Sequence, residues 1–393
     1  MTTNRYGSEA GASVRQQLLK FCFLPNVNQD INILESFQSL FSSSIAHLSG
    51  INQGAYDKSG ITNMQMLLLA ALAAVSALTI AKPIHKRALS SDDTNALQLA
   101  LYLEHLELSL YSEGCNVFTD AQFTAAGFPA GFHSNICVIA NVSSAAPAEA
   151  VELLTDRHQQ ESEHAATISS ILEANGITPV PTCDYTFPYS DPTSFVSLAN
   201  MIINVGLGAY LGGSEQLIDS PVLEEAAGSI LAVEARHDTY LRTGLGASPF
   251  PTSFDTGLSA VWAFNLAQMF VISCPQQLPI VKLPKLNVTT LSPIHLQPAV
   301  TAGTAIHFDW DPSTFFVAVA PDAPLYIAMV NQNISAPMFQ PITKTGTSSG
   351  SVPVPAGFGG IAFACLTTFG GGLTLDQLTS FGTLAGPVEV LLS

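Results

Sequence analysis

Two tetrapeptides of the chain, Glu161-Ser162-Glu163-His164 and Glu234-Ala235-Arg236-His237, share the pattern Glu-x-x-His. Each lies inside a long stretch with helical periodicity, and residues three apart on a helix lie on one face. Each pattern can therefore direct a carboxylate and an imidazole toward one point. A Glu-x-x-His on each of two helices, with one Glu from each of two others, is the ligand set of a carboxylate-bridged di-metal four-helix bundle. The two tetrapeptides thus predict such a bundle over residues 90–275.

The helices that would carry these residues are predicted from hydrophobic spacing, caps and breakers. Ser90 and the residues after it offer N-caps to the first helix, and Gly176 is placed to end the second. Pro221 stands where the fourth helix should begin, a position that favours proline. The expected helices span residues 93–112, 148–174, 194–218, 221–244 and, as an extra fifth helix, 256–272.

The first helix offers Glu104 and Glu107, which lie on one face, as its contribution to a metal site. Either could be the ligand, and Glu104 is favoured because Tyr111 would then lie where a phenol could approach the site. Iron and manganese accept a mixed set of carboxylate and imidazole ligands. The expected metal ligands are Glu104, Glu107, Glu161, His164, Glu234 and His237.

The third helix does not offer its expected carboxylate. If the third and fourth helices are antiparallel, residues 203–208 lie level with Glu234, and none of them is acidic. Glu215 lies two or three turns away, which is more than about 10 Å at 1.5 Å per residue. Asn204 or a water could fill the gap. We therefore expect a degenerate site that binds iron or manganese incompletely or stands empty.

The composition changes after residue 283, where Val, Thr, Phe, Pro and Gly dominate. Short runs bounded by turn residues predict about seven strands over residues 283–393, and hence a small C-terminal β-sandwich. The predicted fold class is α plus β in more than one domain. The clearest strand candidates are residues 305–309, 315–319, 325–329, 361–365 and 388–392.

The N-terminal region contains an apolar run, residues 66–81, with small residues near its end and a dibasic pair soon after. This pattern is typical of a secretory signal peptide. The run is short for a membrane span, so we expect no stable span in the mature protein. Residues 64–87 are interpreted as signal peptide and propeptide. Residues 1–63 are interpreted as disordered or as a gene-model artefact, with translation starting at Met64 or Met66.

Sequons and cysteines agree with secretion to the extracellular space or the cell wall. An oxidising compartment favours disulfides, and the cysteines after residue 87 lie at predicted helix ends and in connections. Connectivity does not follow from sequence alone, so other pairings stay open. The N-glycosylation sequons begin at Asn141, Asn287 and Asn333. The expected pairs are Cys115–Cys137 and Cys183–Cys274, which leaves Cys365 unpaired.

The charge of the chain argues against nucleic acid as a partner. The 393 residues carry a formal net charge of −17 with 13 Lys and Arg. Nucleic-acid binding requires clustered basic residues that neutralise phosphates. An acidic surface exposed to water is the simplest interpretation.

Several separated motifs, in a fixed order, add a family resemblance. They include Leu103-Glu104-His105-Leu106-Glu107, both Glu-x-x-His patterns, the stretch 181–188 and Ser273-Cys274-Pro275. With them, the stretch from about Asp93 to Pro275 resembles the ferritin-like domain of secreted fungal stress-response proteins and plant desiccation-related proteins. The resemblance implies a ferritin-like bundle with a carboxylate and histidine site. Many relatives carry a Glu where this chain has Ile203.

These observations favour a secreted ferritin-like stress or surface protein that is non-enzymatic or marginally enzymatic. One alternative is a working di-iron or di-manganese oxidase or peroxide-detoxifying protein, with Glu104, Glu161 and Glu234 bridging and His164 and His237 terminal. Another makes the β-sandwich a module that contacts cell wall or carbohydrate, with the bundle as its scaffold. The sequence leaves the oligomeric state open.

Overall fold

The computed structural model describes residues 88–139, 160–217, 220–289, 300–332 and 336–392. The interpretations of residues 1–63 and 64–87 lie outside this part of the chain. So do Asn141 and Asn333 of the sequons, and the first part of the helix predicted at 148–174.

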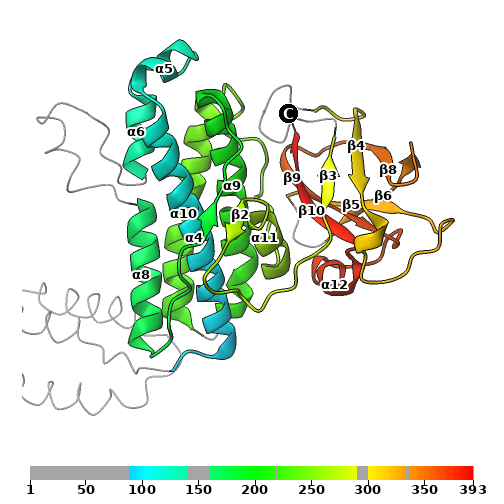
Figure 1. The fold of residues 1–393 in the computed structure, drawn as a ribbon, viewed down its shortest axis with the longest axis horizontal. Helices are drawn as coiled ribbons and strands as arrows, with labels where there is room; N and C mark the ends of the chain where they lie inside the picture. The colour runs from blue at the N-terminus through cyan, green and yellow to red at the C-terminus, as the bar shows by residue number, and fades with distance from the viewer. Residues whose placement is uncertain (1–87, 140–159, 218–219, 290–299, 333–335, 393) are drawn as a thin grey trace, which may run out of the picture. The chain divides into compact units, whose positions relative to one another are not determined.

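Long helices that pack side by side form the part of the molecule built from residues 91–244 (Figure 1). Ser90 caps the first of them in a reciprocal capping box with Asp93, and Asp191 caps the third in the same way with Ser194. The fourth begins at Pro221 and ends at Gly244, as predicted. The helices are α4 (Ser91–Val117), α8 (Gln160–Ala174), α9 (Pro192–Gly213), with a 3-10 extension η1 (Ser214–Leu217), and α10 (Pro221–Gly244).

Helix α9 is the central, most apolar helix of the bundle. It contacts both α4 and α10, and nearly all its residues from Pro192 to Gly208 are buried. By length and composition α9 could cross a membrane, yet 72% of its apolar window is buried inside the molecule. A helix that is hydrophobic all round and covered by neighbours is the core of a bundle.

Two disulfides join distant segments around the bundle, and both predicted pairs are confirmed. Cys115 at the end of α4 bonds Cys137 in α6 (Phe132–Ile139), which follows α5 (Asp120–Ala125). Cys183 bonds Cys274 across a sequence separation of 91 residues, beside the pairing of β1 (Asp184–Tyr185) with β2 (Val271–Ser273). Cys365 is free and buried.

The fifth helix is shorter than predicted. It is α11 (Ala260–Ala267), which Ser259 caps by accepting a hydrogen bond from the Trp262 backbone N–H. The chain then turns into β2, which ends the helix before residue 272. Trp262 donates its indole N–H to Thr383 near the C-terminal strands, and this contact joins α11 to the sheet region.

Within the described residues, two antiparallel four-stranded sheets form the C-terminal region and confirm the α plus β class. Their inner faces share one apolar core that includes Phe308, Ile327 and Val390. Connections between strands contain η2 (Pro312–Thr314), α12 (Leu375–Gln377) and η3 (Leu378–Gly382). One sheet orders β3 (Leu286–Val288), β4 (Ala305–Trp310), β8 (Ser349–Pro353) and β7 (Thr343–Lys344). The other orders β10 (Ala385–Leu392), β9 (Gly360–Thr367), β5 (Tyr326–Val330) and β6 (Met338–Pro341).

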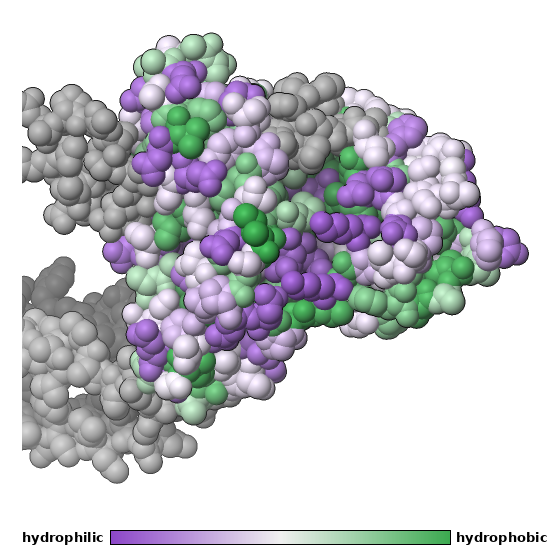
Figure 2. Space-filling view, viewed as in Figure 1, coloured by the Kyte–Doolittle hydropathy of each residue, from purple (hydrophilic) through white to green (hydrophobic). Residues whose placement is uncertain are grey.

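One predicted strand is wrong. Residues 315–319 form no strand, because Asp311 caps the preceding turn η2 and the chain leaves it as an exposed connection. Phe316 and Val317 are 65% and 59% exposed. A short apolar run looks like a strand in sequence, but here only Phe315 and Val319 pack against the sheet core, while Phe316 and Val317 face solvent. Figure 2 shows hydrophobic residues scattered among hydrophilic ones over one face of the molecule, which is normal for a protein surface.

Candidate metal centre

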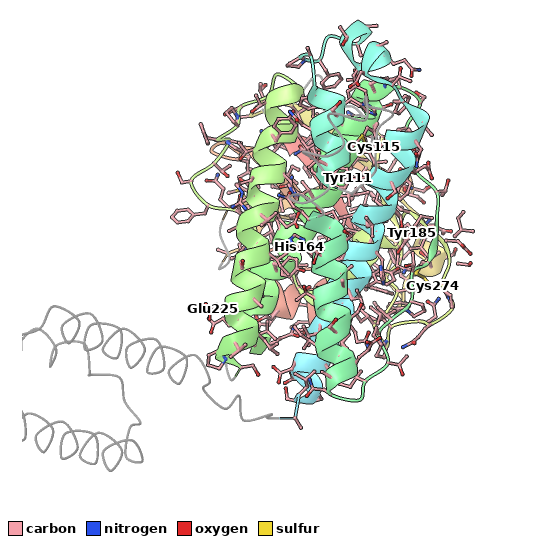
Figure 3. The ribbon with its side chains drawn as sticks, turned by 90° about the vertical axis from the view of Figure 1, so that its left-hand side faces the viewer. Tyr111, Cys115, His164, Tyr185, Glu225 and Cys274 are labelled. Carbon is pink, nitrogen blue, oxygen red and sulfur yellow. A yellow bond between two sulfur atoms is a disulfide. The ribbon has the colours of Figure 1, made fainter. Side chains whose placement is uncertain are left out.

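Helices α4, α8 and α10 bring the predicted ligands together in the interior of the bundle. Glu104, Glu161, His164 and Glu234 are buried, and each offers a ligand atom within 4.8 Å of the others. Figure 3 shows His164 in the middle of the bundle, whereas Glu225 of α10 lies at its outer edge. The i,i+3 spacing of each Glu-x-x-His therefore faces inward, as the two tetrapeptides predicted.

The half of the cluster around His164 is rich in carboxylate. The His164 Nδ1 atom lies 3.3 Å from Glu104 Oε2, 3.1 Å from Glu234 Oε1 and 3.6 Å from Glu161 Oε2. One imidazole nitrogen thus faces oxygens from three helices. Oxygen and imidazole ligands at such a convergence suit iron or manganese.

The half around His237 has fewer carboxylates. His237 Nδ1 lies 3.1 Å from Glu161 Oε1 and 3.2 Å from Glu234 Oε2. Its other nitrogen, Nε2, lies 2.5 Å from Gln160 Oε1. Without a metal, a protonated His237 donates from Nδ1 to the carboxylates and from Nε2 to the amide, whereas loss of the Nδ1 proton would free that nitrogen to bind a metal. Glu161 and Glu234 each present one oxygen to each histidine, which is the arrangement of bridging ligands.

Burial and mutual contact shift the protonation of the cluster. Burial raises the pKa of Glu104 from 4.5 to about 7, although the His164 contact opposes the shift. Burial alone would lower the pKa of His164, but contacts with Glu104, Glu161 and Glu234 raise it to about 12. The same balance, with Glu161 and Glu234, raises the pKa of His237 to about 9. The cluster therefore attracts positive charge, either protons or a metal cation.

Several buried polar atoms of the cluster make no well-aligned hydrogen bond: Glu107 Oε2 and Tyr111 OH have no partner, and the others meet only in the close His–carboxylate contacts given above. Such atoms cost free energy unless something satisfies them. A cation bound between them would do so, and the donor set of oxygens and imidazole nitrogens fits a transition metal. The atoms are Glu104 Oε2, Glu107 Oε2, Tyr111 OH, both carboxylate oxygens of Glu161, His164 Nδ1 and Glu234 Oε1.

Helix α9 contributes no carboxylate at the level of the cluster, as predicted. Ile203 is fully buried there. Asn204 donates to Asp238 Oδ1 at 2.7 Å, so this amide is engaged away from the cluster. Space at Gly206 is taken instead by Glu107, whose Oε1 would collide with any side chain at that position. Glycine on α9 thus lets a carboxylate from α4 reach the face where a third-helix ligand is missing.

Glu107 lies close enough to the cluster to interact with its charges. Burial raises its pKa well above the usual value, and the charges of Glu234, Glu161 and Glu104 raise it further. Glu107 does not belong to the four residues whose ligand atoms lie within 4.8 Å of one another. The structure therefore favours Glu104 as the α4 ligand and places Glu107 against Gly206 of α9, within range of the charges of Glu234, Glu161 and Glu104.

Two contacts of the cluster were missed in the sequence. Tyr210 of α9 donates its hydroxyl hydrogen to Glu104 Oε1, and Gln160 holds His237. Tyr210 follows Ile203 by seven residues, so both lie on one face of α9, and this spacing could have identified it. Gln160 immediately precedes Glu161, and its role depends on a neighbouring helix that local spacing does not reveal.

A second group of potential ligands has a different explanation. It consists of Cys115, His133 and Cys137, whose potential ligand atoms lie within 4.8 Å of one another. The two cysteines form a disulfide and therefore offer no thiolate. His133 contacts Asp120 at 3.3 Å. This group is structural.

Comparisons with known proteins agree with this geometry. The family described as "Ferritin-like domain" matches residues 92–247, which contain every helix that carries the cluster. Residues 92–247 form a ferritin-like domain. The chain is also 24% identical over 305 residues to Protein rds1 of Schizosaccharomyces pombe, covering 68% of this chain and 69% of that protein. The family resemblance inferred from the motifs is thereby confirmed.

Proposed function

We propose that the ferritin-like domain binds iron or manganese through Glu104, Glu161, His164 and Glu234. The convergence of these buried side chains from three helices carries the proposal. The lack of hydrogen bonds to several of their ligand atoms supports it. The mixed carboxylate and imidazole ligands suit both iron and manganese, and these ligand types do not distinguish between the two metals.

The chain's own residues would prepare the site for the metal. Gln160 orients His237, Tyr210 holds one oxygen of Glu104, and the close packing of the helices excludes water. A bound iron or manganese ion would supply one-electron redox chemistry. Such preorganised outer contacts commonly change metal affinity by about 10- to 100-fold.

The missing carboxylate on α9 favours one tightly held ion and a weaker position beside His237. We therefore propose a secreted stress or surface protein with a partly degenerate site as the leading function. A working oxidase or peroxide-detoxifying protein is the second candidate. The observation that favours it is Glu107, a further buried carboxylate that occupies the space at Gly206 and interacts with the charges of Glu104, Glu161 and Glu234.

The prediction that the sheets contact cell wall or carbohydrate stays a prediction. It requires exposed aromatic side chains on one sheet face. The exposed phenylalanines of this region, Phe316, Phe369 and Phe381, lie in connections between strands. No feature of the described sheets supports this function over metal binding.

An oxidising compartment is supported by the two disulfides, and secretion is our proposal. Asn287 of β3 is exposed and begins a sequon. Protein recovered from culture medium should lose mass on treatment with a peptide N-glycosidase, and an Asn287→Gln variant should lose part of that shift. Retention of the full-length chain inside the cell would contradict secretion.

Elemental analysis of the purified full chain tests the metal proposal. We expect wild-type protein to carry about one equivalent of iron or manganese per chain. Glu161→Gln should lose most of it, because this residue contacts both histidines. Glu163→Gln, an exposed position on the same helix, is the matched control and should retain the metal. Equal metal content in the two variants would refute the site.

A further inference from the structure

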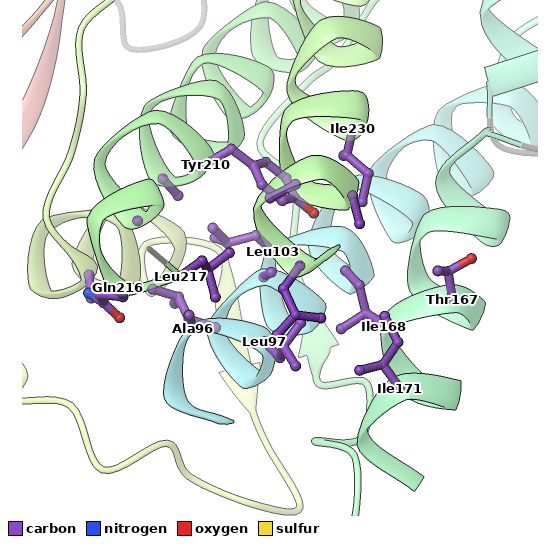
Figure 4. Close-up of a pocket in the computed structure, with 18 residues that line it drawn as sticks. Ala96, Leu97, Leu103, Thr167, Ile168, Ile171, Tyr210, Gln216, Leu217 and Ile230 are labelled. Atoms are coloured by element: carbon purple, nitrogen blue, oxygen red, sulfur yellow. The ribbon is translucent and has the colours of Figure 1, made fainter. Parts of the chain in front are cut away.

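A pocket lined by apolar side chains lies between the four long helices, close to the metal centre (Figure 4). Its cavity volume is about 60 Å³. Among the described residues that line it, none is charged, and the polar side chains are Thr167, Tyr210 and Gln216. The larger apolar side chains are Leu97, Leu103, Ile168, Ile171, Leu223 and Ile230.

The pocket lies one helical turn from the ligand level on three helices. Ala100 precedes Glu104 by four residues, Ile168 follows His164 by four, and Ile230 precedes Glu234 by four. One turn corresponds to about 5.4 Å along each helix axis. The pocket therefore lies directly next to the layer that holds the carboxylate cluster.

Several apolar residues around the pocket are only half-buried. Leu223, Ile230 and Ala227 of α10 keep part of their surface accessible although they face other apolar groups. A lining of apolar residues with a small number of polar groups is typical of small-molecule sites. Burying this apolar surface under an alkyl chain would be favourable.

Tyr210 connects the pocket to the proposed metal centre. Its side chain lines the pocket, and its hydroxyl donates to Glu104 Oε1. Figure 4 shows the Tyr210 ring above the hollow formed by residues of α4, α8 and α10. An occupant that contacts this ring can move the phenol and, through it, a carboxylate of the cluster.

We propose that this pocket binds the alkyl chain of an uncharged amphiphile of the fatty-alcohol class. Ala96 and Leu103 both line it and lie about 10 Å apart along α4 at 1.5 Å per residue, which suits a medium-length chain. A carboxylate head group is disfavoured, because no lining residue in the described chain is cationic and the acidic cluster lies one turn deeper. Binding itself is independent of metal, and only its coupling through Tyr210 rests on the proposed metal centre.

Calorimetric titration of the full chain with 1-octanol and octanoate tests the pocket, because the two probes share a chain length and differ in charge. We expect saturable octanol binding with or without metal, and at least about tenfold weaker binding of octanoate, a difference of roughly 1.4 kcal/mol. Ala227→Phe should fill the pocket and weaken octanol binding at least tenfold. Ala232→Phe, at an exposed position of the same helix, should leave it unchanged. No saturable binding, or equal binding by both variants, would overturn the proposal.

Tyr210→Phe tests the coupling, because it removes only the hydroxyl that contacts Glu104. In metal-loaded wild type, octanol should change the electron paramagnetic resonance spectrum of the bound ion. The variant should still bind octanol but lose this spectral change. An unchanged wild-type spectrum at saturating octanol would refute the coupling. If the protein takes up no metal, the metal proposal fails, and titration of the metal-free protein still decides the pocket.

Discussion

The two halves of the buried cluster start from the same Glu-x-x-His pattern and end in different surroundings. His164 contacts carboxylates from Glu104, Glu161 and Glu234, whereas His237 contacts those of Glu161 and Glu234 and an amide from Gln160. The difference comes from the opposing helices. Helix α4 presents Glu104 to one half, whereas residues 203–208 of α9, expected level with Glu234, contain no acidic side chain for the other.

This comparison shows that a local motif defines only half of a metal position. The i,i+3 pair supplies two ligands, and the neighbouring helix decides whether the set is complete. The asymmetry gives the two histidines different expected importance, and the following experiments test it.

Removing each histidine should have the largest effect and should separate the two halves. We expect His164→Ala to lose most of the bound metal, because its position combines ligands from three helices. His237→Ala should retain about one equivalent with weaker affinity. Elemental analysis after dialysis against a weak chelator measures both. Greater loss in His237→Ala would reverse our assignment of the complete half.

Supplying the absent carboxylate should increase metal content. Ile203→Glu places an acidic side chain at the buried level of α9 that lacks one, so we expect the variant to take up about one further equivalent. Its metal-free form should be less stable than wild type by several kcal/mol, because a buried carboxylate without a partner is costly. Thermal unfolding with and without metal measures both effects.

Ile203→Gln is the control for that experiment, because glutamine has nearly the same shape as glutamate but carries no charge. It should not gain the second equivalent. If Ile203→Glu also takes up no additional metal while remaining folded, Ile203 does not face the incomplete position.

As the pH rises, the stability of the metal-free protein should fall, whereas its affinity for metal should rise. In the metal-free protein the folded state holds extra protons, because the pKa of Glu104 rises from 4.5 to about 7 and that of His237 from 6.5 to about 9. The stabilising contribution of protonated His237 is present below pH 6.5 and lost as pH rises through about 9. The stabilising contribution of protonated Glu104 is present below pH 4.5 and is lost as the pH rises through about 7.

The metal-free melting temperature should therefore fall between pH 5 and pH 9, and a Glu104→Gln variant should show a shallower fall below pH 7. Bound metal displaces these protons, so metal affinity should rise over the same range. Differential scanning fluorimetry at several pH values measures the first trend. A metal-free melting temperature that rises across this window would contradict the assigned protonation.

The smallest effect on metal binding is expected from a change at Gln160, which contacts a histidine but is not itself a proposed metal ligand. Gln160→Leu removes the acceptor of His237 Nε2, so metal affinity at the His237 half should fall about tenfold, the lower end for such contacts. Gln160→Glu keeps an acceptor oxygen and should preserve affinity. A competition assay with a coloured chelator can resolve this difference. Equal affinities of Gln160→Leu and wild type would show that the contact does not orient the imidazole.

Much of the helical architecture could be predicted because its signals are local. Pro221 and Gly244 bound α10 as expected, and the capping box of Ser90 begins α4. The C-terminal sheets were less predictable. Strand β9 is buried along its whole length and was recognised in part, whereas β8 begins at Ser349 in a Gly- and Ser-rich stretch that showed no strand pattern. Strand formation depends on a partner strand distant in sequence.

His105 illustrates the same limit within the bundle. It lies on α4, is half-buried, and has its Nε2 atom 3.2 Å from the carbonyl oxygen of Val180. The link before α9 covers this side of α4, and no periodicity within α4 indicates that covering segment. The burial of one helix face is decided by what packs on it.

The amino-acid sequence alone determined the start of α4 and the bounds of α10, the spacing that pairs each Glu with its His, and the lack of an acidic residue across 203–208. Only the tertiary structure decided that Glu161 and Glu234 each contact both histidines, that Glu107 fills the space at Gly206, and that Tyr210 holds Glu104. The physical reason is the distance over which each interaction acts along the chain. Helix formation and i,i+3 pairing depend on neighbours within one or two turns, while a buried site depends on distances between helices, which the packing of the whole core sets.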